Sequence, residues 1–134
     1  MEDLVLQNLN EKWKCDLNFG WIPITSDIDI PNTEIYKANC FSENLTNISQ
    51  LLKNLFDIVK VYEIQEGGNV TLKELVECDF CYDGLEYIYT DEKFRFVIYC
   101  SHENSITVGG RELIDRIHEV WPNYINCIWT DSIF

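Results

Sequence analysis

Three cysteines and one histidine in this sequence have types and spacings that could bind zinc. Cys78 and Cys81 form a Cys-x-x-Cys pair, and Cys100 stands two residues before His102. Three thiolates and one imidazole can complete the tetrahedral coordination of a structural zinc ion. A second Cys-x-x-Cys pair is missing, and Cys100 falls at an inward-facing position of an expected strand. We therefore expect no metal and no cofactor, and keep zinc binding by these four residues as an alternative.

The same region could also support nucleophilic catalysis. In such an enzyme Cys100 would attack the substrate, His102 would act as general base and Glu103 would orient the imidazole. Neighbouring residues of an extended chain point to opposite faces, however, which works against a direct pairing of His102 with Glu103. The only other histidine, His118, falls on the polar side of an expected helix, and no triad spacing is present. We expect a protein that is not an enzyme, and keep a small cysteine/histidine hydrolase as an alternative.

A pair of glycines, Gly109 and Gly110, precedes an expected helix and could present backbone N–H groups to an anion. The sequence around them has neither the dinucleotide-binding glycine pattern nor a Walker motif. We predict that the two glycines serve a tight turn.

Acidic and aromatic side chains alternate between residues 74 and 92, a stretch without lysine or arginine. Aromatic rings supply rigid contact area, and carboxylates steer and pair with basic groups, so this mixture suits a protein that binds a basic protein surface. We expect the tyrosines to act as anchors and the acids as charge partners. The predicted partner-binding residues are Asp79, Tyr82, Asp83, Glu86, Tyr87, Tyr89, Asp91 and Glu92. A second lysine-free stretch, residues 15–36, could extend the patch.

Composition favours the same class of function. The 134 residues include 10 lysines and arginines against 23 aspartates and glutamates, which gives a net charge of −13. This charge makes nucleic acid and anionic membranes poor partners and a basic protein a good one. The hydrophobic content of 46% is enough for a folded core, and we predict a single domain over residues 1–134. The sequence has no recognisable secretion signal and no long apolar run, so we expect a cytoplasmic protein with reduced thiols.

Hydrophobic periodicity predicts a mixture of helices and strands. Helical spacing of apolar residues is found over residues 2–13, 42–59 and 111–121, and the Thr71–Glu74 sequence fits a capping box that would begin a short helical turn. Strand patterns are found over residues 60–65, 85–89, 94–100 and 105–108, with one or two weak strands between 20 and 41. We expect the apolar C-terminal tail to pack back onto the fold.

These elements predict an α+β fold. We expect an antiparallel sheet of about four or five strands, packed on one face by the amphipathic helices. The other face would then stay open and serve as a docking surface.

The order of elements near the C-terminus resembles that of a known group of proteins. An aromatic strand runs from Phe94 to Cys100, Ser101–Glu103 follows, a second strand leads to the glycine pair, and a helix ends at Trp121. In this order the last third of the chain resembles small bacterial immunity proteins, which protect cells from polymorphic or contact-dependent growth-inhibition toxins. The resemblance implies a cytoplasmic, non-catalytic protein that neutralises one cognate basic toxin domain, often a nuclease, by covering its active site or substrate groove. A DNA-mimic inhibitor of a nucleic-acid-binding protein is the alternative within the binding class.

Overall fold

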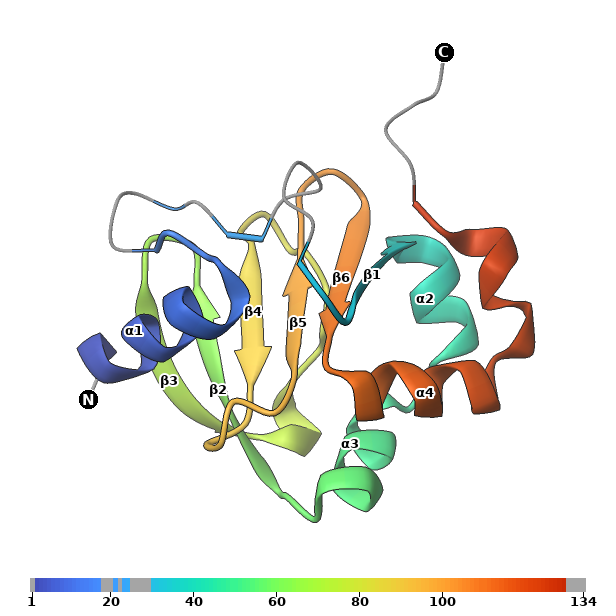
Figure 1. Ribbon diagram of the computed structural model, residues 1–134, viewed down its shortest axis with the longest axis horizontal. Helices are drawn as coiled ribbons and strands as arrows, with labels where there is room; N and C mark the ends of the chain where they lie inside the picture. Colours follow the sequence, from blue (N-terminus) through green and yellow to red (C-terminus); the bar gives the residue numbers. More distant parts are fainter. Residues whose placement is uncertain (1, 18–20, 22, 25–29, 130–134) are drawn as a thin grey trace.

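One antiparallel sheet organises the molecule. The computed structural model describes residues 2–17, 21, 23–24 and 30–129, and within them six strands join in the order β1-β6-β5-β4-β2-β3 (Figure 1). The strands are β1 (Thr33–Lys37), β2 (Lys60–Gln65), β3 (Asn69–Glu74), β4 (Tyr87–Thr90), β5 (Val97–Cys100) and β6 (Ser105–Gly109). Every neighbouring pair is antiparallel. The α+β class is confirmed, and the strand number is six instead of four or five.

Three helices cover one face of the sheet, as the amphipathic patterns predict. They are α2 (Ala38–Asn44), α3 (Ile48–Phe56) and α4 (Arg111–Val120). Leu52 of α3 and Ile117 of α4 are fully buried and belong to the same core as Ile98 and Ile106 of the central strands. Alternate residues of a strand point to opposite faces, so Ile98 and Cys100 meet this core while Val97 and Tyr99 meet another.

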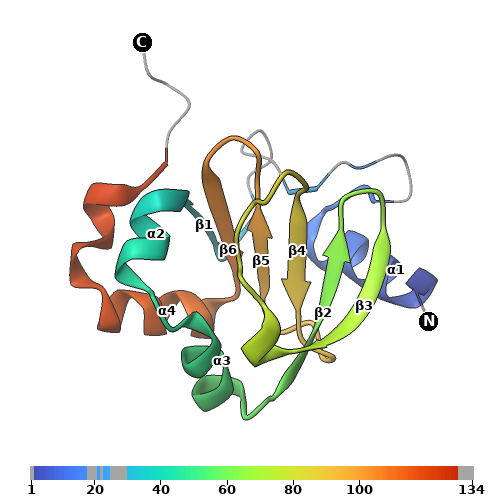
Figure 2. The same cartoon turned by 180° about the vertical axis from the view of Figure 1, so that it is seen from behind.

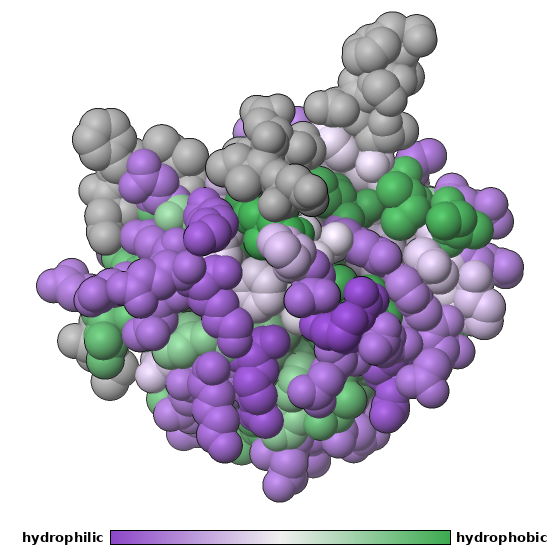
Figure 3. Space-filling view, viewed as in Figure 1, coloured by the Kyte–Doolittle hydropathy of each residue, from purple (hydrophilic) through white to green (hydrophobic). Residues whose placement is uncertain are grey.

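The expectation of an open second face is wrong. Helix α1 (Glu2–Trp13) lies across that face (Figures 1 and 2), and its Leu9 and Trp13 pack in a second core with Ile88 and Val97. The spacing of leucines and tryptophan that predicts this helix also gives it an apolar stripe, which the sheet buries. The outer surface on this side is predominantly hydrophilic (Figure 3).

The glycine pair before α4 makes close approaches possible. A Cβ on Gly109 would lie 2.7 Å from the Trp13 ring and from the Val97 side chain. Gly110 has a φ of +119°, and its N–H donates a hydrogen bond to the carbonyl of Asn32 at 2.9 Å. A turn that needs left-handed backbone therefore accounts for Gly110, as predicted, whereas Gly109 ends β6 and is required by its close packing against Trp13 and Val97.

Two predicted helical segments fold differently. The apolar stripe over residues 42–59 is divided between α2 and α3, because Asn47 caps a new helix by accepting a hydrogen bond from the N–H of Gln50. The Thr71–Glu74 sequence forms most of β3, where pairing with β2 replaces the expected capping box; a 3₁₀ turn, η1 (Leu75–Glu77), follows it. Pairing with β2, and not the local capping signal, therefore determines the structure of this segment.

The C-terminal region packs back onto the sheet as far as the structure describes it. A 3₁₀ segment, η2 (Pro122–Cys127), follows α4, Ile128 forms an isolated bridge with Tyr36 of β1, and the N–H of Trp129 donates to the carbonyl of Ile35. The rest of the expected tail, residues 130–134, and residues 25–29 of the lysine-free stretch lie outside the described residues. In the described part of the chain, no helix has the length and apolar character needed to span a membrane.

Candidate functional site

Residues 75–86 carry four of the eight predicted partner-binding side chains and cross the sheet from one end to the other. We name them the crossing segment. Glu74 at the end of β3 pairs with Lys60, whereas Tyr87 at the start of β4 pairs with Gln65, so the segment connects opposite ends of β2 (Figure 2). It runs over the helix-covered face, where the ring of Phe80 lies 4.5 Å from that of Tyr89.

Buried and exposed side chains alternate along the crossing segment. Leu75, Phe80 and Glu86 are almost fully buried and fix the segment to the sheet. Between these points the side chains of Asp79 and Asp83 are exposed, together with Val76 (87% exposed), Tyr82 (45%) and Leu85. The segment therefore presents carboxylates and apolar groups from a backbone held at several positions.

The structure divides the eight predicted partner-binding residues into two groups. Asp79, Tyr82, Asp83 and Glu92 are exposed, and Tyr87 is half-buried, with its hydroxyl donating to Asp83 at 3.0 Å. The remaining three, Glu86, Tyr89 and Asp91, are buried, and their polar atoms bond within the fold. These three are not placed to contact a partner directly.

Glu86 collects four hydrogen bonds on one buried carboxylate. The indole N–H of Trp21 and the hydroxyl of Tyr99 each donate to Oε1 at 2.8 Å. The backbone N–H of His102 donates to Oε2 at 2.8 Å, and the Nδ1 of its imidazole also bonds Oε2. Burial alone would raise the pKa of this carboxyl, but the hydrogen bonds from His102, Tyr99 and Trp21 outweigh it and hold the pKa below its ordinary value. The same hydrogen bond and the Glu86 charge raise the pKa of His102.

Tyr89 and Asp91 also have partners inside the fold. The hydroxyl of Tyr89 donates to Glu63 at 2.9 Å. Asp91 is completely buried and accepts hydrogen bonds from the backbone N–H and the Nε of Arg95 at 2.7 and 2.6 Å. The Arg95 guanidinium lies over the ring of Phe56, 4.9 Å from its centre, and bonds the carbonyl that ends α3. Asp91 and Arg95 thus join the β4–β5 connection to α3.

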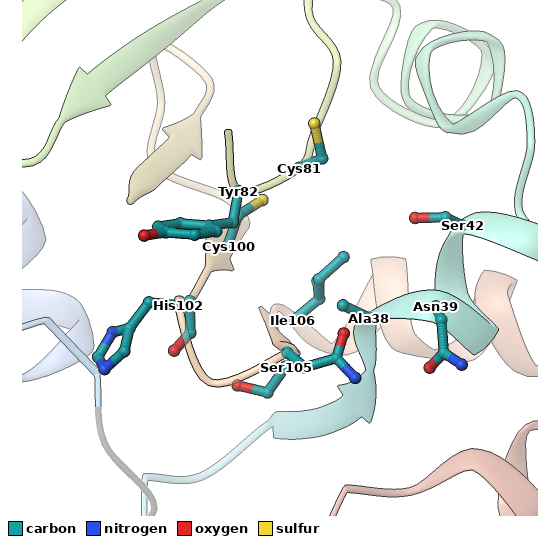
Figure 4. Close-up of a pocket in the computed structure, with 11 residues that line it drawn as sticks. Ala38, Asn39, Ser42, Cys81, Tyr82, Cys100, His102, Ser105 and Ile106 are labelled. Atoms are coloured by element: carbon teal, nitrogen blue, oxygen red, sulfur yellow. The ribbon is translucent and has the colours of Figure 1, made fainter. Parts of the chain in front are cut away.

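A surface pocket of about 310 Å³ opens beside the crossing segment. Helix α2 supplies Ala38, Asn39 and Ser42, the crossing segment supplies Cys81 and Tyr82, and the strand ends and turn of β5 and β6 supply the rest (Figure 4). The imidazole of His102, at the edge of this pocket, is turned away from the sulfur of Cys100 (Figure 4). Cys100 is buried, and burial raises the pKa of its thiol far above the ordinary value.

The catalytic arrangement considered from the sequence is therefore not assembled. Cys100 faces the helix-covered core, whereas the His102 ring is directed to Glu86. Glu103, the expected orienting acid, is exposed, and its backbone N–H bonds Ser101. The residue that orients the imidazole is Glu86, sixteen positions earlier, which sequence reasoning assigned to partner binding.

The zinc arrangement is not assembled either. Among the described residues, which include all the cysteines and both histidines, no group of three or more potential metal ligands converges. All six cysteines, each within the described ranges, are free thiols. Cys81, Cys100 and His102 all line the same pocket, but with Cys78 they do not form a group that could hold a metal ion.

Trp21 and Tyr99 were missed as partners of Glu86. Their donor groups come from a loop and a strand far from Glu86 in the sequence, and no local motif marks them.

Comparisons with protein-family models, curated proteins and solved structures gave no match to this chain.

Proposed function

We propose that the protein binds a basic protein surface through the crossing segment and thereby inhibits its partner. The supporting observation is the set of acids that this region exposes. Glu74 at the end of β3 and Glu77, Asp79 and Asp83 in the crossing segment are all exposed, and none forms an ion pair within the described part of the chain. Their charges are available to a partner.

The acids stand beside exposed apolar groups, as a specific interface requires. Val76, Tyr82 and Leu85 lie between or next to these carboxylates in the crossing segment. Interfaces place aromatic and apolar groups at their centre and charged groups at the rim, where the charges mainly raise the association rate. Because Leu75, Phe80 and Glu86 hold the backbone, binding would require little ordering of this segment.

The partner that we propose is a cognate bacterial toxin domain, with this protein as its immunity protein. The resemblance of the last third of the chain to such proteins and the net charge of −13 support this assignment. The carboxylates would take the place of nucleic-acid phosphates on a basic toxin, so that the inhibitor covers the active site or substrate groove without any chemistry of its own. We propose a cytoplasmic location, which agrees with six unpaired thiols.

The test begins with the partner itself. The tagged protein is used to capture proteins from its own organism at low and then moderate salt, and the captured protein is identified by mass and purified. We expect one stoichiometric basic partner whose association rate falls as salt rises, since the Debye length shrinks to about 8 Å at physiological ionic strength. Growth of cells that express the partner, with and without this protein, then measures protection.

A pair of charge-reversal variants locates the interface. Asp79→Lys with Asp83→Lys should slow association by about tenfold or more and reduce protection. Glu43→Lys with Glu112→Lys makes the same change in net charge at two exposed helical positions outside the crossing segment. Equal slowing by both pairs would show that only net charge matters, and would contradict an interface at the crossing segment.

A further inference from the structure

The pocket beside the crossing segment has polar groups that the fold leaves unused. Ser105 is only 7% exposed, yet its hydroxyl forms no hydrogen bond with any other described residue. The side chains of Asn39, Ser42 and Asn104, which also line the pocket, are likewise unbonded within the described ranges. Asn39, Ser42 and Asn104 are exposed to solvent, and together with the Ser105 hydroxyl they offer several free donors and acceptors to a polar ligand in the pocket.

The charges around the pocket favour a cation as that ligand. No lysine or arginine occurs among the described residues that line it. On the crossing-segment side, the exposed Asp79 and Asp83 stand two residues before and two residues after Cys81, which lines the pocket. On the other side, the charge of His102 is balanced by the buried Glu86 carboxylate, and Glu103 lies nearby.

The shape of the pocket favours a planar cation on an aliphatic chain. Its volume of about 310 Å³ is at the lower end for small-molecule sites, so it suits one inserted side chain better than a cofactor. The exposed ring of Tyr82 forms one side, and Ser42 of α2 lies across from it (Figure 4). A guanidinium group can stack on an aromatic ring and donate in several directions in its plane, which a lysine ammonium cannot do.

We propose that this pocket receives an arginine side chain of the basic partner. This inference rests on the proposed function, and it adds the point at which the partner is anchored. The guanidinium would stack on Tyr82 and donate to the unbonded hydroxyl and amide oxygens of the pocket. Arginine is also among the residues that most often dominate the binding energy of interfaces.

The pocket can be tested without the partner by titrating the full chain with N-acetyl-L-arginine amide. Two-dimensional NMR at constant ionic strength and pH would report the backbone N–H shifts. The expected result is a saturable shift centred on residues 81–82 and 101–106. The citrulline analogue has nearly the same shape as the arginine analogue but no charge, and the lysine analogue is charged but lacks the planar guanidinium group. Both should bind several-fold more weakly. Equal binding by the citrulline analogue, or shifts spread over all acidic surfaces, would overturn the proposal.

Matched variants separate the pocket from general acidity. Ser42→Trp fills the mouth of the pocket from an exposed helical position and should abolish the saturable shift, whereas Asn54→Trp on α3 should leave it intact. Tyr82→Leu should weaken arginine binding about three- to fivefold, and Tyr82→Phe should keep it, because only the ring is needed. A Ser42→Trp protein that binds arginine normally would refute the pocket.

The partner assay keeps this inference distinct from the proposed function. If the captured partner binds Ser42→Trp as tightly as the unaltered protein but is lost on reversal of Asp79 and Asp83, the pocket proposal fails and the proposed function stands. If neither change affects the partner, both fail. A loss of affinity in both variants, with normal folding in the NMR spectrum, supports the anchored arginine.

Discussion

The carboxylate of Glu86 and the imidazole of His102 form an ion pair that joins the start of β4 to the turn between β5 and β6. The carboxylate is buried, whereas the imidazole is largely exposed. Tyr99 and Trp21 donate to the same carboxylate, so three separated parts of the chain meet on one side chain. This turn also borders the proposed arginine pocket, and Glu86 holds one of the pocket's lining residues, His102, without lining the pocket itself.

The first prediction concerns the stability that this carboxylate provides. Glu86→Ala should lower the free energy of unfolding by about 2–4 kcal/mol, because Tyr99 and Trp21 lose their acceptor in a buried site. Glu103→Ala should change it by less than about 0.5 kcal/mol, since that side chain is exposed. Urea unfolding followed by fluorescence measures both. A Glu103→Ala protein as unstable as Glu86→Ala would contradict the assignment of this structural role to Glu86.

The second prediction is the pH dependence of the Glu86–His102 pair. The pKa of Glu86 is lowered from 4.5 on folding, so its contribution is complete above pH 4.5 and is lost as the pH falls through the folded value. The pKa of His102 is raised from 6.5, so its contribution is complete below pH 6.5 and is lost as the pH rises through the folded value. The pair should therefore stabilise the fold most between pH 4.5 and 6.5.

A double-mutant cycle isolates this effect from all other titrations. Thermal unfolding of the unaltered protein, His102→Gln, Glu86→Gln and the double variant gives the coupling between the two side chains at each pH. The coupling should be greatest between pH 4.5 and 6.5 and should decline on both sides. A coupling that stays constant from pH 4 to pH 9 would show that the two groups do not interact as charges.

Sequence patterns predicted the elements whose signal is periodic and local. The helices over residues 2–13 and 111–121, and the strand before Gly67 and Gly68, were predicted almost at their observed limits. Sequence patterns gave wrong predictions where segments distant in the chain determine the secondary structure or the packing. Thr71–Glu74 became a strand because β2 lies beside it, and the second sheet face closed because α1 covers it. Periodicity does not show where a distant segment will pack.

The candidate site was predictable in composition but not in detail. The alternation of acids and aromatics singled out a segment in which Asp79, Tyr82 and Asp83 are exposed. It gave no means of separating these from Glu86 and Asp91, whose burial depends on Trp21, Tyr99 and Arg95. An acidic side chain has the same local sequence signal whether it meets solvent or a buried donor, so only the fold distinguishes the two roles.

The third prediction separates two neighbouring acids that were predicted to act alike. Asp91→Ala should lower the free energy of unfolding by about 2–4 kcal/mol, because the backbone N–H and guanidinium of Arg95 lose their acceptor. Glu92→Ala should cost less than about 0.5 kcal/mol, since Glu92 is exposed. Chemical unfolding of both variants provides the comparison. Similar stability of the two would contradict a structural role for Asp91.

The fourth prediction uses two glycines with nearly the same backbone angle. Gly84 and Gly110 have φ values of +111° and +119°, so alanine is strained at both. A Cβ on Gly84 would meet nothing within 4 Å, whereas a Cβ on Gly110 would lie 2.8 Å from the carbonyl oxygen of Arg95. Gly84→Ala should therefore cost about 1 kcal/mol from backbone strain alone. Gly110→Ala should cost at least about 1 kcal/mol more, because the β4–β5 connection or the start of α4 must shift to relieve the contact. Equal unfolding midpoints for the two variants would show that the approach of Arg95 to Gly110 is looser than this packing requires.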